Sequence, residues 1–159
     1  MVTVSMLWSL AKKIGRLALY GWNKQLRTCE ASFVDEVLLR VDEWDRKALL
    51  AQLEQRERLQ RWNSDRMVLF GFGEKAALPR IGDQSENHCI AKARLKGTIT
   101  SVSVALMSHK GLLSSIEFSK SPRALEGAGV TVEALKLAPA HAGYAVNVDA
   151  EEHHVGRRE

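Results

Sequence analysis

One run in the sequence has the spacing of a nucleotide-binding loop, the letters GFGEKA over residues 71–76. It matches the G-x-G-x-x-A form of the dinucleotide fingerprint, and a short apolar run over 67–70, which suits a strand, precedes it. The fingerprint also requires a helix whose N-terminus holds the pyrophosphate. Pro79 follows too soon to leave room for that helix. We therefore interpret these glycines as residues that end a strand and allow positive φ.

The two cysteines are not arranged for catalysis. His88 directly precedes Cys89, and neighbouring side chains on a strand point to opposite faces, so they cannot act together as base and nucleophile. We expect Cys89 in the core and Cys29 as a buried cysteine near a helix end, where free cysteines commonly lie. Two cysteines are too few for a disulfide framework, which favours a reducing compartment.

The C-terminal residues 151–154, with the letters EEHH, could bind a metal by composition. Adjacent histidines in a polar tail lack the spacing of an organised zinc or iron site. The sequence also lacks the G-x-S-x-G, H-E-x-x-H and G-x-x-x-x-G-K-[ST] motifs. We therefore predict no catalytic residue, no metal site and no cofactor, and we favour a protein that is not an enzyme.

The N-terminal segment 5–27 is the most distinctive part of the chain. Plotted at about 100° per residue, its apolar residues fill one side of a helix and its basic residues fill the other. The first acidic residue is Glu30. A basic face of this kind can contact an acidic protein, a nucleic acid or an anionic membrane surface, and charge alone does not choose among them. The basic residues of the segment are Lys12, Lys13, Arg16, Lys24 and Arg27.

This predicted helix has two alternative roles. Gly15 and Gly21 fall in its apolar arc, which favours close packing against another element and hence a place in the core. The arc is wider than the ~100° stripe that a helix on one sheet needs, which favours a second surface such as a membrane or a partner. We prefer the packed role, and keep membrane or partner docking as the alternative.

A second basic feature lies on a predicted strand over residues 89–96. Small and apolar residues alternate there with Lys92, Arg94 and Lys96, so the three basic side chains share the outward face. Such a stripe could contact an anionic partner, although exposed strands often carry lysine for solubility alone. Nucleic acid is disfavoured as the partner because the stripe lacks the aromatic residues that stack on bases.

The overall composition is that of one ordinary globular domain. The chain has 159 residues, a net charge of +4, 45% hydrophobic residues and 26% charged residues. The uncharged run 17–23 is far shorter than the roughly 20 residues that span a bilayer. Basic residues also interrupt the stretch where a secretory signal would be apolar. We expect a cytoplasmic protein, with peripheral attachment to the membrane as the alternative.

The remaining pattern predicts the fold class. Ser32 and Asp35 form a capping-box pattern, and helical spacing with acid-before-base pairs continues to Trp62, which predicts a helix over 33–62. From residue 66 to 137 the period becomes two, which is typical of strands. We therefore predict an α+β fold in which two N-terminal helices, 5–27 and 33–62, pack on an antiparallel meander of four to five strands. Residues 1–139 form the domain and 140–159 a C-terminal tail.

These observations favour a small, non-enzymatic protein-binding module of the immunity or adaptor type, with another protein as its partner. The alternative is a peripheral membrane protein attached through the basic amphipathic helix 5–27. A third hypothesis is an enzyme whose site is assembled from scattered residues. The residues at which we expect contact with a partner or an anionic surface are Lys12, Lys13, Arg16, Lys24, Arg27, Lys92, Arg94 and Lys96.

Overall fold

The computed structural model describes residues 25–73, 77–125 and 129–139. In this part of the chain two helices come first, and six strands with a short 3-10 helix follow. The elements are α2 (Thr28–Arg40), α3 (Glu43–Gln55), β1 (Arg58–Trp62), β2 (Met67–Gly71), β3 (His88–Lys96), β4 (Ser101–His109), β5 (Leu112–Phe118), η1 (Pro122–Leu125) and β6 (Thr131–Leu137).

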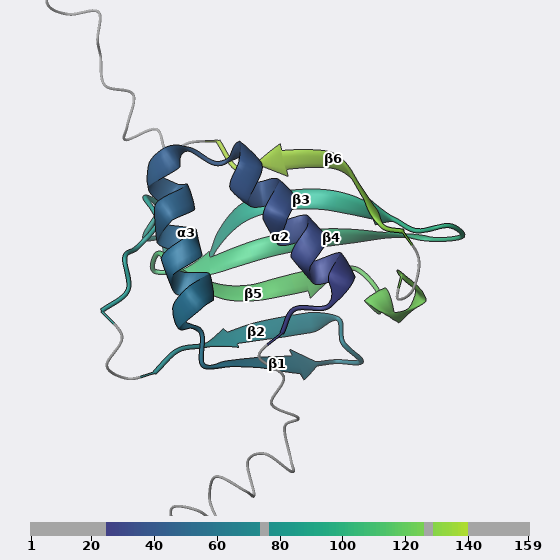
Figure 1. The fold of residues 1–159 in the computed structure, drawn as a ribbon, viewed down its shortest axis with the longest axis horizontal. Coiled ribbons are helices and arrows are strands. Elements are labelled where there is room, and N and C mark those ends of the chain that lie inside the picture. Colours follow the sequence, from purple (N-terminus) through teal and green to yellow (C-terminus); the bar gives the residue numbers. More distant parts are fainter. Residues whose placement is uncertain (1–24, 74–76, 126–128, 140–159) are drawn as a thin grey trace, which may run out of the picture.

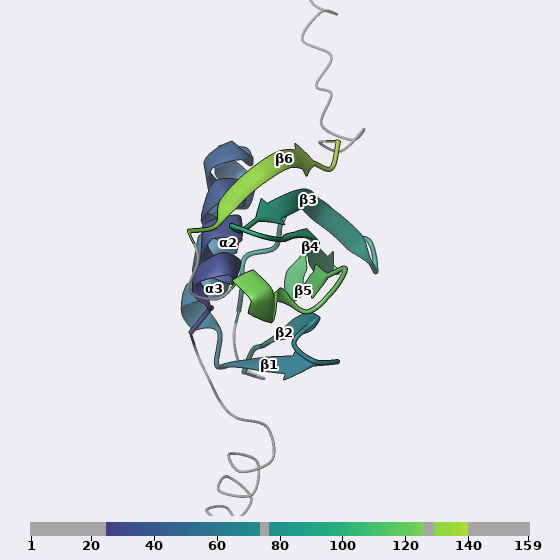
Figure 2. The ribbon, with the colours of Figure 1, turned by 90° about the vertical axis from the view of Figure 1, so that its right-hand side faces the viewer.

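The six strands form one antiparallel sheet in the order β1-β2-β5-β4-β3-β6. Both helices lie across the same face of this sheet (Figure 1). After a turn of 90°, the helices are seen on one side of the strands, while no described helix covers the other side (Figure 2). The predicted α+β arrangement, with helices N-terminal to an antiparallel sheet, is confirmed.

The core lies between the two helices and the sheet. In β4, and in β3 from Ala91 onward, every second residue is buried, so their apolar side chains share the face toward the helices. Cys29, Phe33, Val37 and Val41 recur at helical spacing and bring α2 onto that face. Fully burying a side chain of this kind stabilises the fold by about 1.5–3 kcal/mol. The largest fully buried apolar side chains are Phe33, Leu49, Leu59, Leu95, Leu106, Ile116 and Leu125.

The predicted single helix over 33–62 is wrong in both its start and its length. The helical region begins at Thr28 and is divided at Val41, whose extended backbone ends α2. Asp42 then caps α3, because its carboxylate accepts the Asp45 N–H at 2.9 Å. The guanidinium of Arg46 satisfies carbonyls at the end of α2, donating to Leu38 O at 2.6 Å. Sequence reasoning missed this helix start because Asp42 and Asp45 lie among other charged residues, and such a run is typical of the exposed surface of one continuous helix.

The last part of that predicted helix is a strand. β1 pairs with β2, which places Leu59 opposite Phe70 on the helix side of the sheet. The predicted apolar stripe of a long helix also fails, because Trp44 is 72% exposed and Trp62 is 53% exposed. β1 has only five residues, which is too short for hydrophobic periodicity to distinguish a strand, with a period of two, from a helix, with a period of 3.6. This strand, added to the strands within the predicted range 66–137, gives six strands where four to five were predicted.

Two predicted segments fall largely or wholly outside the described residues. The helix over 5–27 lies outside except for residues 25–27, and the tail 140–159 lies outside entirely. Among the described residues, no helix is long and apolar enough to cross a membrane.

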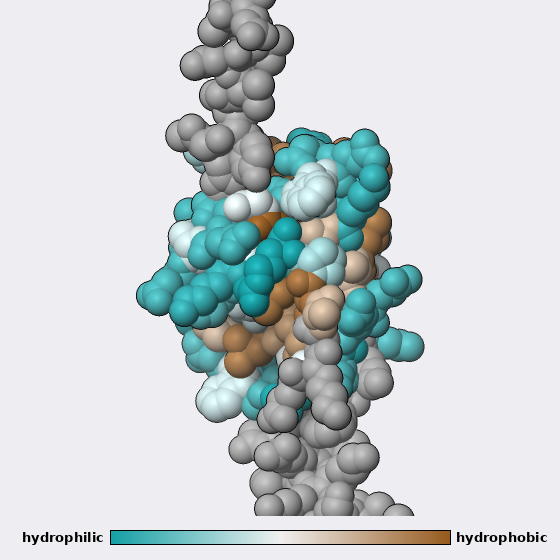
Figure 3. Space-filling model, turned by 90° about the vertical axis from the view of Figure 1, so that its left-hand side faces the viewer, coloured by the Kyte–Doolittle hydropathy of each residue, from teal (hydrophilic) through white to brown (hydrophobic). Residues whose placement is uncertain are grey.

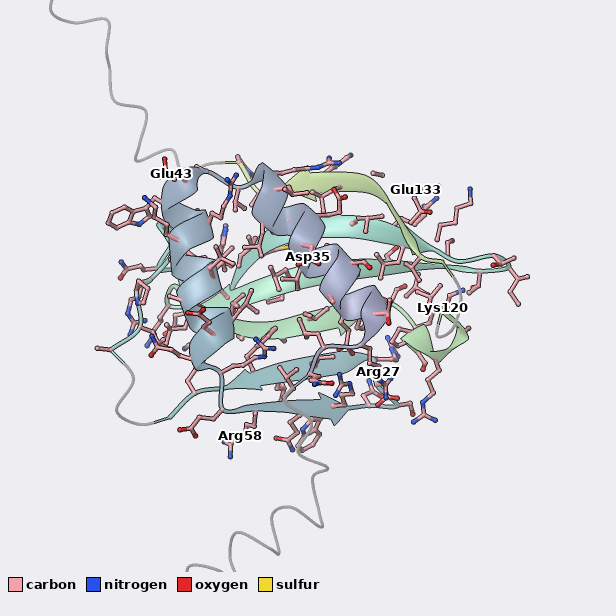
Figure 4. All side chains as sticks on the ribbon, viewed as in Figure 1. Arg27, Asp35, Glu43, Arg58, Lys120 and Glu133 are labelled. Carbon is pink, nitrogen blue, oxygen red and sulfur yellow. The ribbon has the colours of Figure 1, made fainter. Side chains whose placement is uncertain are left out.

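Two ion-pair clusters hold the start of α2 against the β1–β2 hairpin. Glu30 is fully buried and accepts hydrogen bonds from the Arg27 N–H at 2.8 Å and from Arg61 Nη2 at 2.6 Å. Asp65 accepts from Arg27 Nη1 at 3.1 Å and from Arg123 Nε at 2.7 Å. Figure 4 shows Arg27 at the beginning of α2, above the β1–β2 end of the sheet. The clusters connect α2, the hairpin turn and η1.

Asp65 provides a prediction about pH. Burial alone would raise the pKa of Asp65, but the hydrogen bonds from Arg123 and Arg27 outweigh burial and hold the pKa below its usual value. A carboxylate with a lowered folded-state pKa stabilises the fold above its unfolded pKa, and this contribution is lost as pH falls through the folded pKa. We expect Asp65→Asn to lower the free energy of unfolding at pH 7, and the difference from wild type to shrink below about pH 4.

Urea titrations at a series of pH values measure this difference. Asparagine tolerates the left-handed backbone of residue 65, where φ is 65°, so the substitution tests charge rather than backbone strain. Asp35 is exposed on α2 (Figure 4) and Asp35→Asn is the matched control. A stability difference for Asp65→Asn that stays constant from pH 7 to pH 3 contradicts the prediction.

Candidate functional site

The face of the sheet opposite α2 and α3, here named the open face, carries a continuous row of side chains. Strand register places Met67 beside Trp62 and Glu117, Ala105 beside Glu117 and Lys92, and Lys92 beside Lys136. These neighbours lie on the face opposite the buried residues because side chains alternate along each strand. From β1 to β6 the row reads Trp62, Met67, Glu117, Ala105, Lys92 and Lys136.

A hollow of about 740 Å³ lies on the open face over β3, β4 and β5 and reaches β6. Ala105 and Met107 supply apolar surface, while Lys92, Arg94 and Lys136 supply positive charge. More of its lining is apolar than polar. A surface of this kind can hold a ligand that has both apolar groups and negative charge.

The basic residues around the hollow differ in whether they have partners. Lys96 Nζ forms an ion pair with Glu133 Oε1 at 3.3 Å, near the β3–β4 end of the sheet where Figure 4 labels Glu133. Within the described ranges, no carboxylate forms an ion pair with Lys92, Arg94 or Lys136. Three cations that form no ion pair within the described ranges therefore line one hollow, together with the carboxylate of Glu117.

The acidic groups on the open face have partners of their own. Glu117 Oε1 accepts a hydrogen bond from Ser115 Oγ at 2.9 Å. Glu133 lies opposite Arg94 in the β3–β6 register, but its carboxylate pairs with Lys96. These contacts leave the region around β3 and β6 positive and the β5 position negative, so charge is unevenly distributed across the sheet.

The structure brings together part of the predicted set of contact residues. Lys92, Arg94 and Lys96 share the open face, as their alternation predicts. Arg27 lies instead in the ion-pair cluster of α2, with its side chain 30% exposed. Lys12, Lys13, Arg16 and Lys24 lie outside the described residues.

Sequence reasoning missed Lys136, Met107 and Trp62 as members of this face. Lys136 lies on β6, which pairs with β3 although 34 residues separate the two strands. The alternation of residues 131–137 could have predicted which face of the sheet Lys136 occupies. The sheet order that places Lys136 beside Lys92 cannot be predicted from the residues of either strand.

Cys89 is not in the core as predicted. An irregularity in the β3–β4 register between Cys89 and Ala91 moves the cysteine into register with Met107, on the open face. Burial raises the pKa of the Cys89 thiol despite the nearby charge of Lys92. Cys29 is buried as expected, and burial together with Glu30 raises the pKa of its thiol. Thiols with raised pKa values are poor nucleophiles at neutral pH.

Asp83, His88 and Ser108 have the residue types of a hydrolase triad. His88 Nδ1 lies 3.0 Å from Asp83 Oδ2, and His88 is opposite Ser108 in the β3–β4 register. However, Ser108 is 1% exposed, and its hydroxyl has no hydrogen-bond partner among the described residues. A nucleophile in this position cannot meet a substrate, so we do not assign catalysis to this group. The described residues also hold no cluster of three potential metal-ligating side chains.

The glycine motif over 71–76 does not form a nucleotide loop in the described residues. Gly71 ends β2, as predicted, but Gly111 is the glycine with positive φ among those described. Gly71 is required for space instead, because an added Cβ would overlap Arg58 Cγ. Residues 77–87 contain no helix, and residues 74–76 lie outside the described ranges.

Figure 3 shows the end of the molecule formed by α3 and the ends of the strands. Hydrophilic atoms cover much of it, and apolar atoms gather in its lower half. The side chains of Lys47 and Glu43 on α3 are both strongly exposed and form an ordinary i,i+4 ion pair at 2.7 Å. Lys47 thus contrasts with Lys92, Arg94 and Lys136, which form no ion pair within the described ranges.

No protein-family model, curated protein or solved structure matches the chain. The class that the fold defines is a small α+β domain with helices on one face of an antiparallel sheet. Its function must be inferred from its own residues.

Proposed function

We propose that this protein is a small, non-enzymatic protein-binding module that holds an acidic segment of a partner protein on its open face. The observation that carries the proposal is the hollow where Lys92, Arg94 and Lys136 converge without a carboxylate partner in the described residues. Positive surface beside apolar surface attracts a segment that offers carboxylates and apolar side chains together. An immunity or adaptor protein acts by binding of this kind, without chemistry.

The composition of the open face favours a protein over a nucleic acid as the partner. Methionine, tryptophan and arginine are enriched at protein interfaces, and the face presents Met67, Met107, Trp62 and Arg94. The free thiols of Cys29 and Cys89 support a cytoplasmic location.

Binding of a synthetic acidic peptide tests the proposal. The probe is a fluorescein-labelled 16-residue peptide of leucine, glutamate and glutamine, and its neutral twin has glutamine in place of every glutamate. We expect the full chain to bind the acidic probe more tightly than the twin, by fluorescence anisotropy. Reversing one exposed charge in Lys92→Glu should weaken binding of the acidic probe about fivefold.

Lys47→Glu is the matched control, because it makes the same charge change on α3, away from the open face. Equal binding of the acidic and neutral peptides contradicts the proposal, as does an equal loss in Lys92→Glu and Lys47→Glu. Binding to phosphatidylserine vesicles that survives Lys92→Glu, with neither peptide bound, would support attachment through residues 5–27 and overturn the proposal.

A further inference from the structure

We infer that the segment held on the open face is an amphipathic helix of the partner protein, which lies across the strands with its acidic residues over β3 and β6. Its apolar residues then lie over Met67 and Leu69 on β2 and over Met107 on β4, on either side of Glu117 on β5, and end at Trp62 on β1. This inference rests on the proposed function and specifies the shape and polarity of the occupant.

The first support is the polarity of the open face from one edge of the sheet to the other. The β1 and β2 half presents Trp62, Met67 and Leu69 beside Gln60 and Arg58, while the β3 and β6 half presents Lys92 and Lys136. Glu117 on β5 lies between the two halves. Trp62 is 53% exposed, although large apolar side chains are usually covered. An occupant that matches both halves needs apolar groups at one end and carboxylates at the other.

A second row of side chains strengthens the apolar half. Strand register places Leu69 opposite Gln60 and Ser115, and Met107 opposite Ser115 and Cys89. Leu69 and Met107 are both partly exposed. Apolar side chains therefore occur in both rows, at Met67 and Leu69 on β2 and at Ala105 and Met107 on β4, which gives the apolar stripe of an amphipathic helix more than one row to contact.

The length of the row fits a helix of ordinary size. Six strands at about 4.8 Å spacing give a row of about 24 Å. At 1.5 Å rise per residue, a helix of about 16 residues covers that length. A second helical layer would also complete the arrangement in which both faces of the sheet are covered.

The edges of the sheet disfavour the alternative in which the partner adds a strand. The β3–β6 register shifts between Lys92 and Arg94, and Ala134 in β6 has a φ of 50°, so the β6 edge is irregular. At the other edge, β1 has only five residues and carries the charged side chain of Arg58, which Figure 4 labels. Irregular backbone, short length and charge all protect edges from pairing.

The experiment compares two acidic peptides of identical composition. In the helical probe, leucines recur at i, i+3, i+4 and i+7 and the glutamates are gathered in one half. In the alternating probe, leucines occupy every second position, which favours an extended strand. We expect the full chain to bind the helical probe at least tenfold more tightly by fluorescence anisotropy, with a gain of helical circular dichroism on binding.

A pair of tryptophan variants locates the apolar end. Trp62→Ala should weaken binding of the helical probe about tenfold and leave its salt dependence unchanged, because an aromatic anchor without charge is lost. Trp44→Ala removes an even more exposed tryptophan from α3 and should leave binding unchanged. Leu69→Gln gives a second change on the same apolar half, and thermal unfolding checks that each variant folds.

The outcomes separate this inference from the proposed function. Charge-dependent binding in which the alternating probe equals the helical one, or Trp62→Ala equals Trp44→Ala, overturns the helical occupant and leaves the binding module intact. Failure of both acidic peptides to bind better than the neutral twin overturns both. Binding of a 16-nucleotide oligodeoxythymidine in place of the peptides would also overturn both and make the open face a nucleic-acid surface.

Discussion

Replacing Gln52 by alanine is expected to lower the free energy of unfolding by about 3–5 kcal/mol, because a buried backbone N–H and a partly buried carbonyl lose their hydrogen-bond partner and a cavity forms in the core. Gln52 is fully buried on α3. Its Nε2 donates to Pro79 O at 2.7 Å and to Gly111 O at 3.0 Å, and its Oε1 accepts the Leu113 N–H at 2.7 Å. One side chain thus joins the helix, the segment before β3 and the β4–β5 hairpin.

The surrounding backbone cannot replace these bonds easily. Gly111 has a φ of 78°, and an added Cβ there would lie 2.9 Å from Arg80 Cβ, so the hairpin is closely packed against the segment that contains Pro79. Gly111 O keeps a hydrogen bond from the Ile81 N–H at 3.0 Å, but Pro79 O and the Leu113 N–H lose the partner that Gln52 provides. An unsatisfied buried group costs about 1–3 kcal/mol.

Urea titration monitored by circular dichroism at 25 °C measures the effect. Gln52→Met keeps most of the side-chain volume and separates lost hydrogen bonds from a cavity. Gln55→Ala is the matched control, because Gln55 is exposed on the same helix and should change stability by less than about 0.5 kcal/mol. If Gln52→Ala unfolds at the same urea concentration as Gln55→Ala, the hydrogen bonds of Gln52 do not stabilise the fold as described.

The strands in which apolar and polar residues alternate clearly were predictable from the sequence. The elements whose structure depends on contacts with distant parts of the chain were not. β4, and β3 from Ala91 onward, bury every second residue, and this period two is visible in the letters alone. Gln52 and Arg61 fall within the predicted helix over 33–62, whereas the structure shows that they contact segments 27 and 31 residues away. Propensity and periodicity are local, so they cannot identify a polar residue that a distant backbone satisfies.

The candidate site was predictable to a similar degree. The shared face of Lys92, Arg94 and Lys96 follows from alternation within one strand. Their neighbours Lys136 and Trp62 belong to the face only because β6 returns beside β3 and because residues 58–62 form a strand. Cross-strand neighbours depend on sheet order, which the sequence of any one strand does not encode.

Replacing Glu30 by leucine is expected to lower the free energy of unfolding by about 3–5 kcal/mol, because it leaves a buried cation without its partner. Glu30 is 0% exposed, and the side chain of Arg61 is only 11% exposed. Arg61 donates to both carboxylate oxygens, from Nη2 at 2.6 Å and from Nε at 3.2 Å. The same carboxylate accepts the Arg27 N–H at 2.8 Å, so the substitution also removes a capping interaction of α2.

The double variant Glu30→Leu/Arg61→Leu distinguishes the cost of an unpaired buried charge from the effect of burying apolar side chains at this position. Two apolar side chains in place of a buried ion pair remove the uncompensated charge, so the double variant should be more stable than Glu30→Leu alone. Glu36→Leu is the matched control on the exposed side of α2, where Glu36 pairs with Arg40 at 3.6 Å and both side chains are well exposed. Denaturant titrations of the four proteins form the test. If Glu30→Leu and Glu36→Leu lose equal stability, Arg61 is satisfied by solvent, and α2 is held to the hairpin by apolar packing alone.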